Sequence, residues 1–388
     1  MEGDARGSSR NCGGDRVIIQ ERVQAAAAQS IPLRIAGRAT WLGAGRPVAA
    51  TQTVSLADHS GVVDYVPNDL TITIRSGTSL GDLARVIDDE GQWWPVNPFG
   101  SDDGSIGATV ATASSGPFAH GFGTVRDLVL GVEVITGEGK IIRGGGRVVK
   151  NVAGFDLVRL MTGSWGTLGA ISELTLRLYA KPSHRATMAM EAPTDARRLA
   201  ERFRALLDAP VIPFGLELIN DNLSQHIGLP RRQMILVEFG GNSAAVSAQR
   251  DAFRKIGAAI EAPTGCWDQL RVAASGTNTV FRLSGLPVGL ATRWNLANTI
   301  LEDSADVLIH ASIGRGIVRC VVPNALSSAA IEKLVSAKTN HTLILESVPA
   351  DLWKKISPSA IADRLSQSVR RAFDPMGILN PGILGPVN

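Results

Sequence analysis

The sequence predicts an α+β protein built from two domains of different character. Between Pro95 and Ile171 glycine recurs every few residues, with Ser, Thr and Ala between the glycines. Such small residues let the backbone approach a ligand closely and leave N–H groups free to bind phosphate. After Ser183 the glycine density falls, and alternating strand and helix patterns begin. We therefore expect a nucleotide-binding first domain, with a turn-rich β-domain as the alternative, and an α+β second domain.

Composition excludes several classes of protein. The chain has 388 residues, 44% of them hydrophobic, which is enough for a sizeable core and two or three domains. Its net charge of +3 is too small to favour nucleic-acid binding, and no apolar run approaches the roughly 18 residues of a membrane span. Cys12, Cys266 and Cys320 are widely spaced, which excludes a disulfide framework or CxxC site and fits a reducing cytoplasm. The polar segment 1–16 lacks the apolar core of a signal peptide and is expected to be disordered.

The first domain is predicted to contain short strands and capped helices. A helix through Val23 stops before Pro32, and the strand that follows leads into a loop at 36–43. Ser79, with Asp82 three residues later, resembles a capping box at the start of a second helix. Further expectations are a strand at 70–74, a hairpin turn at 136–139, a short helix capped by Asp156, a strand through 174–178, and a solvent-facing His59 in a polar turn.

The second domain is predicted to repeat a strand–helix–strand pattern. Helices are expected at 194–208, 243–257, 287–302 and 326–338. Strands are expected at 185–191, 212–219, 233–240, 278–284, 306–313, 316–323 and 342–347. This order fits two ferredoxin-like halves. A last helix at 361–373 leads to a closing segment, so the predicted organisation is 1–16 disordered, 17–182 first domain, 183–355 second domain and 356–388 returning to the first.

Four pieces of the first domain carry a family resemblance. They are 97–101 (NPFGS), 105–112 (SIGATVAT), 125–131 (VRDLVLG) and 149–156 (VKNVAGFD). In this order and spacing they resemble the FAD-binding domain of the vanillyl-alcohol oxidase and p-cresol methylhydroxylase (PCMH) flavoproteins, and more narrowly the E subunit of bacterial glycolate oxidases. The resemblance implies a PCMH-type FAD-binding domain of two α+β subdomains, followed by a ferredoxin-like α+β cap domain. It is strong over 33–182 and 371–383 and weak between them.

The resemblance also implies which residues hold FAD. In the family the loop after the first strand binds the pyrophosphate. Here Arg38 and Ala39 replace two of its glycines, and Arg38 either pairs with a phosphate or is solvated. Some relatives attach FAD through a His in this loop, but none lies between Val17 and Ala50, so we expect non-covalent FAD. The expected FAD-binding residues are Ala36, Gly37, Arg38, Ala39, Thr40, Trp41, Pro98, Gly100, Ser101, Ser105, Ile106, Gly107, Ala108, Thr109, Ala111, Thr112, Ser114, Ser115, Gly116, Arg126 and Asp127 (expected as an ion pair), Asn151, Ala153, Gly154, Phe155, Asp156, Gly166, Gly169, Ile171 and Asn380.

The catalytic residues of relatives are only partly matched. Catalytic relatives carry the cap motif His-Ala-Gly-Asp-Gly-Asn-Leu-His, whose paired histidines bind metal. The nearest match is 310–317 (HASIGRGI), which keeps His310 but has Ile313 in place of the acid and Ile317 in place of the second His. We therefore expect no metal. The catalytic candidates are His310, Arg282 and Arg319, with a satisfied half-buried imidazole as the alternative for His310 and a structural acid as the alternative partner of each arginine.

Three functions follow as hypotheses. The first is the FAD-binding subunit of a glycolate oxidase-type 2-hydroxy acid dehydrogenase. It would work only in a complex with a flavoprotein subunit and an iron–sulfur subunit, because this chain lacks cluster-type cysteines. The second is a stand-alone FAD-dependent D-2-hydroxy acid dehydrogenase of the D-lactate type, and the third is a non-catalytic assembly subunit with a flavin fold. We expect a cytoplasmic protein, held at the inner membrane only through partners, with no direct membrane insertion and no nucleic-acid partner.

Overall fold

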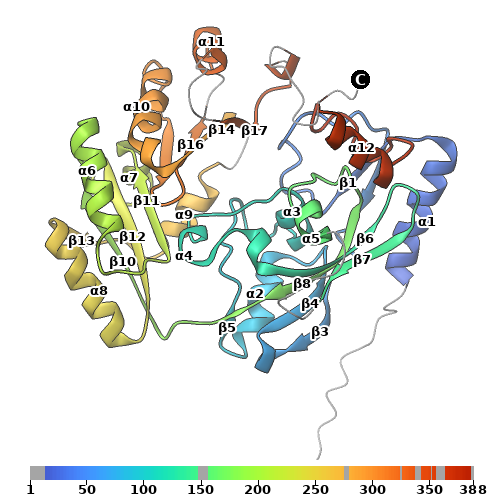
Figure 1. The fold of residues 1–388 in the computed structure, drawn as a ribbon, viewed down its shortest axis with the longest axis horizontal. Coiled ribbons are helices and arrows are strands. Elements are labelled where there is room, and N and C mark those ends of the chain that lie inside the picture. The colour runs from blue at the N-terminus through green and yellow to red at the C-terminus, as the bar shows by residue number, and fades with distance from the viewer. Residues whose placement is uncertain are drawn as a thin grey trace, which may run out of the picture.

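Two large β-sheets organise the chain (Figure 1). The structure, a computed structural model, describes residues 14–146, 156–274, 279–323, 326–336, 342–350, 352–354 and 363–385. A five-stranded sheet belongs to the N-terminal half, and an eight-stranded sheet is formed by strands between residues 184 and 347. The C-terminal helix then returns beside the N-terminal helix and strands (Figure 1). This is the α+β architecture that the sequence predicts.

The five-stranded sheet is antiparallel and has the order β3-β4-β8-β6-β7. Apolar side chains of helices α2, α3 and α5 pack with it into one core. Ser79 and Asp156 cap α2 and α5 as predicted, because each side chain accepts a hydrogen bond from the amide three residues on. The elements of this half are β3 (Val62–Val66), η1 (Pro67–Asp69), β4 (Thr71–Arg75), α2 (Leu80–Asp88), β5 (Gln92–Trp93), α3 (Ile106–Ala111), α4 (Ala119–Phe122), η2 (Val125–Leu128), β6 (Val129–Ile135), β7 (Ile141–Gly145), α5 (Leu157–Met161), β8 (Ala170–Arg177) and β9 (Tyr179–Ala180).

A smaller layer lies beside this sheet and includes both ends of the described chain. Strands β1 (Leu33–Ala36) and β2 (Gln52–Ser55) pair in parallel, and helix α1 (Gly14–Gln29) buries Val23 in the same core as Leu33. After helix α12 (Arg364–Phe373) the closing segment joins β1, since the Leu33 amide donates to the Ile378 carbonyl at 2.7 Å. Ile378 and Leu379 of the closing segment are thus part of the core that α1, β1 and β2 form.

The eight-stranded sheet, which we call the cap sheet, has the order β13-β10-β12-β11-β15-β16-β14-β17. Each half of this order is the ferredoxin-like arrangement of fourth, first, third and second strand, and the halves join antiparallel through β11 and β15. Its elements are β10 (His184–Glu191), α6 (Ala196–Leu207), β11 (Gly215–Ile219), α7 (Asp221–His226), β12 (Met234–Gly241), α8 (Ser243–Ile256), β13 (Ala259–Glu261), α9 (Cys266–Val272), β14 (Thr279–Ser284), η3 (Pro287–Gly289), α10 (Leu290–Ile300), β15 (Leu308–Ser312), β16 (Ile317–Val322), α11 (Ser328–Ser336), β17 (Thr342–Ser347) and η4 (Leu352–Lys354).

The two faces of the cap sheet differ in chemistry. One face is apolar and packs in one core with α6, α8 and α10, which Figure 1 shows on the side away from the first domain. The opposite face meets the first domain, since Phe99 packs on His310 and Phe118 packs on Trp267. Acidic and basic side chains of this face are buried there. Burying a charge without a partner is costly, so the pairing of these groups decides what the interface can do.

The structure differs from the sequence-based predictions in three short elements and in the exposure of His59. Helices α7 and α9 and strand β13 are not predicted, because each is seven residues or fewer and lacks a clear periodicity. The prediction that His59 faces solvent is wrong, since only 2% of its surface is exposed. Its amide donates to Leu56, and its carbonyl accepts from Gly77, which folds the polar turn against the chain that follows β4.

Candidate functional site

A cleft next to β1 brings together four distant parts of the chain. We call it the β1 cleft. It is formed by the loop that follows β1, by α3, by the turn that precedes β8 and by the closing segment. Fifteen expected FAD-binding residues line it: Ala36, Gly37, Arg38, Ala39, Thr40, Trp41, Ser105, Gly107, Ala108, Ala111, Thr112, Gly166, Gly169, Ile171 and Asn380. Further lining residues that the sequence analysis missed are Arg34, Ile35, Leu42, Ala44, Val48, Leu56, Ser76, Trp165 and Ile383.

Close backbone packing explains the small residues of the β1 cleft. A Cβ atom on Gly37 would lie 2.1 Å from the Ser105 Oγ, so no larger residue fits there. Ser105 begins α3, where its Oγ accepts a hydrogen bond from the Ala108 amide at 3.3 Å. Gly166 is restricted in the same way, because its Cβ would lie 2.6 Å from the Asn380 side-chain nitrogen. These glycines keep the segments in contact around the cleft.

The loop after β1 carries the two residues that replace glycines in the family. Ala39 has a φ of +60°, the left-handed conformation that glycine adopts at little cost. Ala39 therefore holds a conformation in which a glycine would be less strained. Arg38 is exposed, and its Nε donates to the Asp103 carbonyl at 2.9 Å. This hydrogen bond holds the guanidinium group beside the β1 cleft.

Other expected FAD-binding residues lie outside the β1 cleft. Ile106 and Thr109 are buried in or beside the core of the five-stranded sheet, and the Thr109 hydroxyl donates to the Ser105 carbonyl. The expected ion pair of Arg126 with Asp127 is wrong. The Asp127 carboxylate instead accepts from the Thr124 amide at 2.8 Å and hydroxyl at 2.7 Å, which closes the turn. Asp156 is used as a helix cap, Ser101 accepts from Gly104, and Asn151, Ala153, Gly154 and Phe155 fall outside the described residues.

A second, smaller pocket lies where the polar face of the cap sheet meets the first domain. We call it the cap pocket. The first domain contributes Phe99, Ser115, Gly116 and Pro117, and the cap contributes the three catalytic candidates, Arg282, His310 and Arg319. Sequence reasoning missed Glu217, Ser312, Arg315, Ile317 and Glu346, which also line it. Ser114 directly precedes the lining residue Ser115, and its buried hydroxyl has no hydrogen-bond partner among the described residues.

Two of the three arginines that line the cap pocket, Arg282 and Arg319, have an acidic partner in the protein. The Arg319 Nε donates to Glu346 at 2.9 Å, and the Arg282 Nε lies 3.7 Å from the other Glu346 oxygen. His310 Nδ1 is 2.7 Å from a carboxylate oxygen of Glu217, and both side chains are buried. A structural acid therefore stands beside each arginine, the alternative that the sequence analysis left open. Neither glutamate is found from sequence, because each lies on a strand that only the fold brings next to its partner.

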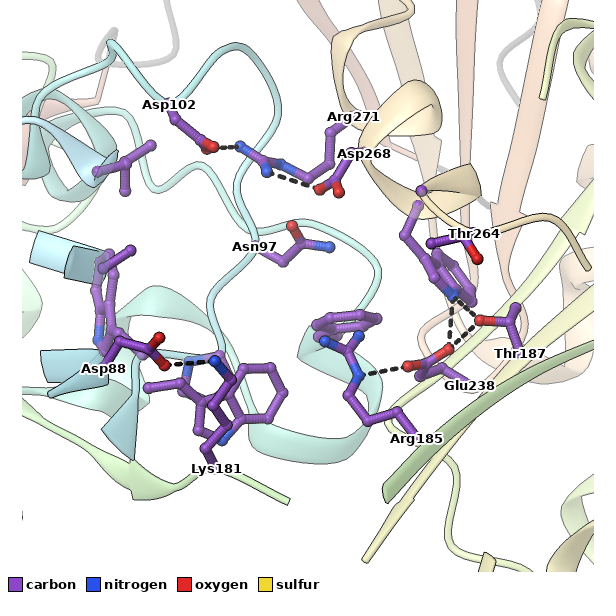
Figure 2. Close-up of a pocket in the computed structure, with 18 of the residues that line it drawn as sticks. Asp88, Asn97, Asp102, Lys181, Arg185, Thr187, Glu238, Thr264, Asp268 and Arg271 are labelled. Atoms are coloured by element: carbon purple, nitrogen blue, oxygen red, sulfur yellow. Dashed lines mark hydrogen bonds and ion pairs between the residues drawn. The ribbon is translucent and has the colours of Figure 1, made fainter. Parts of the chain in front are cut away.

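A third cavity, of about 840 Å³, separates α2 from α9 and strands β10 and β12 (Figure 2). Arg271 crosses between the domains there, since it donates to the Pro98 carbonyl at 2.8 Å, the Gly100 carbonyl at 3.1 Å and Asp102 at 2.7 Å. This contact explains two expected FAD-binding residues, Pro98 and Gly100, as parts of a domain junction. Each basic residue that lines the cavity is ion-paired, as Figure 2 shows for Arg271, Arg185 and Lys181. Among the described residues that line it, the cavity therefore offers no free cation for a ligand.

The described residues form neither a metal-binding cluster nor a membrane-spanning helix. In the part of the chain that the structure describes, no three His, Cys, Asp or Glu side chains are grouped to hold a metal ion. No helix within the same residues is long and apolar enough to cross a membrane. Cys266 and Cys320 are buried, and burial raises the pKa of the Cys266 thiol to about 11, so neither is suited to be a nucleophile.

Comparison with known proteins identifies the fold and one matched region. Residues 17–145 match the family model described as FAD binding domain. The structure of p-cresol methylhydroxylase with substrate bound matches 95% of this chain, and the match covers 87% of the methylhydroxylase chain. The TM-score is 0.73 and the sequence identity is 15%. The fold is that of PCMH-type flavoenzymes, an FAD-binding domain with a large antiparallel cap sheet.

Two curated relatives frame the question of function. Glycolate oxidase subunit GlcE of Escherichia coli strain K12 is 40% identical over 175 residues, which cover 45% of this chain and 49% of that protein. D-2-hydroxyglutarate dehydrogenase of Xanthomonas citri pv. viticola is 26% identical over 414 residues, which cover 94% of this chain and 86% of that protein. The match thus spans about half the length of the glycolate oxidase subunit and most of the second relative.

Proposed function

We propose that the β1 cleft holds FAD without a covalent bond. The observation that carries this is the convergence of four separate segments, with many Gly, Ala, Ser and Thr residues among them, on one cleft of an FAD-binding fold. Gly37 and Gly166 let the walls of the cleft pack closely, because a Cβ atom on either would meet Ser105 or Asn380 from a neighbouring segment. None of the residues that line the cleft in the described structure is a His, Cys or Tyr, the side chains best suited to attach a flavin covalently.

We further propose that the chain is the FAD-binding subunit of a glycolate oxidase-type 2-hydroxy acid dehydrogenase. The similarity to GlcE supports the subunit role. FAD supplies a two-electron acceptor when it is bound, and the residues of this chain bind and orient it. A flavoprotein subunit and an iron–sulfur subunit would complete the complex, because the three cysteines of this chain cannot hold a cluster. In this proposal the protein is cytoplasmic and meets the inner membrane through those partners.

Dye-reduction assays on the isolated chain and on the complex test this proposal. The tagged chain is produced alone and together with the products of its neighbouring genes, and each preparation is given glycolate and D-lactate. We expect turnover only where a flavoprotein and an iron–sulfur protein co-purify, because the metal-binding cap motif of catalytic relatives is incomplete here. Turnover by the isolated chain in the usual range of about 1–1,000 per second would contradict it.

The same assay decides a second candidate, a stand-alone D-2-hydroxy acid dehydrogenase. The observation that favours it is the buried pair of His310 and Glu217 in the cap pocket, together with the full-length match to a D-2-hydroxyglutarate dehydrogenase. A third outcome, a chain that joins a complex but retains no flavin, would indicate a non-catalytic assembly subunit. Flavin content, co-purification and turnover therefore separate the three functions.

A further inference from the structure

An open groove lies on the outer side of the cap, beside helices α6 and α8. Figure 1 shows both helices on the side of the cap sheet away from the first domain. The groove has a volume of about 880 Å³, and its lining combines the end of β10, one face of α6 and the last turn of α8. We call it the α6–α8 groove. Because the cap sheet lies between this groove and the first domain, it is separate from the β1 cleft and from the cap pocket.

Three cations of the α6–α8 groove have no ionic partner in the described part of the chain. They are Arg198 and Arg202 of α6 and Lys255 of α8. The Arg202 Nη1 lies 3.2 Å from the Met190 Sδ, which is a weak acceptor. In the third cavity, by contrast, each basic residue has an acidic partner. The α6–α8 groove thus keeps three neighbouring cations ready for a ligand.

The two acids of the groove do not cancel this charge. Glu191 accepts from the Arg232 Nη1 at 2.8 Å, and Glu201 accepts from the Arg197 Nε at 3.2 Å. Neither of these arginines lines the groove, so each acid is neutralised from outside it. A concave surface with an excess of one sign of charge concentrates ions of the opposite sign. The occupant of the groove is therefore expected to be anionic.

The spacing of the cations indicates the shape of the occupant. Arg198 and Arg202 are four residues apart on α6, so they lie one turn, roughly 6 Å, apart along the helix. Lys255 belongs to the last turn of α8. Cations that follow a groove suit several carboxylates on one chain better than a single compact phosphate. Alternate side chains of an extended peptide repeat about every 6.5–7 Å, which matches the spacing on α6.

Two other anionic partners fit the groove less well. Among the described residues that line it there is no aromatic side chain on which a nucleic-acid base could stack. A lipid surface is best met by protruding cations with apolar side chains that insert beside them. Here the cations line a hollow, and its larger apolar residues, Pro193 and Ile256, are half-buried.

We propose that the α6–α8 groove is a docking site for an acidic segment of a partner protein. The carboxylates of that segment pair with Arg198, Arg202 and Lys255 along the groove. Exposed ion pairs contribute little singly, so the affinity comes from several acting together and depends on salt. This inference goes beyond the proposed function, because it places a partner surface on the cap that does not depend on FAD.

Fluorescence anisotropy of the full chain with a labelled peptide tests this inference. The acidic peptide alternates glutamate with glycine, and a second peptide has glutamine in place of each glutamate. At low ionic strength we expect the acidic peptide to bind at least about tenfold more tightly, and added salt should reduce the difference. Arg202→Gln and Lys255→Gln should each weaken binding of the acidic peptide by about two- to fivefold. Arg198→Glu should weaken it at least about tenfold, because a like charge replaces the ion pair.

Arg204→Glu is the matched control. It makes the same change of charge at another exposed arginine of α6 that does not line the groove, so we expect less than about a threefold loss. An equal loss in Arg198→Glu and Arg204→Glu would show attraction to diffuse charge and would overturn the inference. So would equal affinity for the two peptides, a comparison that needs no variant to fold.

A vesicle experiment distinguishes a membrane from a protein partner. The chain is sedimented with vesicles of phosphatidylcholine and phosphatidylglycerol, and we expect no binding that depends on Arg198. Sedimentation that Arg198→Glu abolishes would assign the groove to a lipid surface and overturn the inference. Circular dichroism checks the fold of each variant. Because neither experiment needs flavin, their outcomes are distinct from success or failure of the proposed FAD site.

Discussion

The side-chain oxygen of Asn380 accepts a hydrogen bond from the backbone amide of Ile35 at 2.7 Å, although 345 residues separate the two. The side-chain amide of Asn380 donates to the Trp165 carbonyl, also at 2.7 Å. The residue has a φ of +44°, a left-handed conformation that asparagine tolerates better than most residues. One side chain therefore joins three segments that line the β1 cleft.

Substitutions of Asn380 separate its contacts from its backbone conformation. Asn380→Gly keeps the left-handed backbone and removes both hydrogen bonds, so we expect a loss of about 1–3 kcal/mol in unfolding free energy and weaker FAD binding. Asn380→Asp keeps the acceptor for Ile35 but loses the donor to Trp165, and we expect an intermediate loss. Urea unfolding and FAD titration measure the two effects. A glycine variant as stable as wild type would show that these contacts do not hold the cleft.

Ala39 offers a test of backbone strain. Because its φ is +60°, Ala39→Gly should raise the unfolding free energy by about 1 kcal/mol. Ala36→Gly is the matched control. Ala36 is a buried residue of β1 without a positive φ, so this change should destabilise by roughly 0.5–1 kcal/mol. Thermal unfolding of both variants is the measurement, and a destabilised Ala39→Gly protein would refute the strain.

Helix α3 distinguishes a residue that contacts the cofactor from one that packs the fold. Ala108 lines the β1 cleft and is only partly buried, so Ala108→Leu should leave the fold intact and weaken FAD binding at least about tenfold. Gly107→Ala should destabilise the fold itself, because its Cβ would lie 2.6 Å from the Ser76 Cβ and 2.9 Å from the Ser76 carbonyl oxygen. Fluorescence titration measures the FAD affinity of the two variants, and unfolding curves measure their stability. Tight FAD binding by the Ala108→Leu variant would show that the cofactor does not lie against Ala108.

Gly107 also makes a contact that the sequence does not predict. Its place in a glycine-rich motif predicts a wall beside the flavin, but the pattern does not reveal that Ser76 from another segment fills the space next to it. Most of the longer helices and strands of the cap are predicted closely, whereas the short α7, α9 and β13 are not. Glu217 and Glu346 are not predicted as partners of His310 and Arg319, because side-chain pairs across a sheet depend on register.

His120 predicts a dependence of stability on pH. Burial lowers the pKa of this imidazole below its usual 6.5, Glu217 opposes the shift, and Arg315 adds to it. The unfolded chain therefore binds more protons than the native chain just below pH 6.5, so stability falls as the pH falls through that window. His120→Gln should flatten this part of the profile. Urea unfolding at pH 7.5, 6.5 and 5.5 is the measurement, and an unchanged slope would contradict the assignment.

Titration of the flavin-free chain with FAD, followed by flavin fluorescence and then by acid precipitation, tests the central claim most directly. With a non-covalent FAD site in the β1 cleft, we expect saturable binding of one FAD per chain and complete release of the flavin into the acid supernatant. Binding that does not saturate near one equivalent would contradict an FAD site in the β1 cleft, and flavin that stays with the precipitated protein would contradict non-covalent attachment.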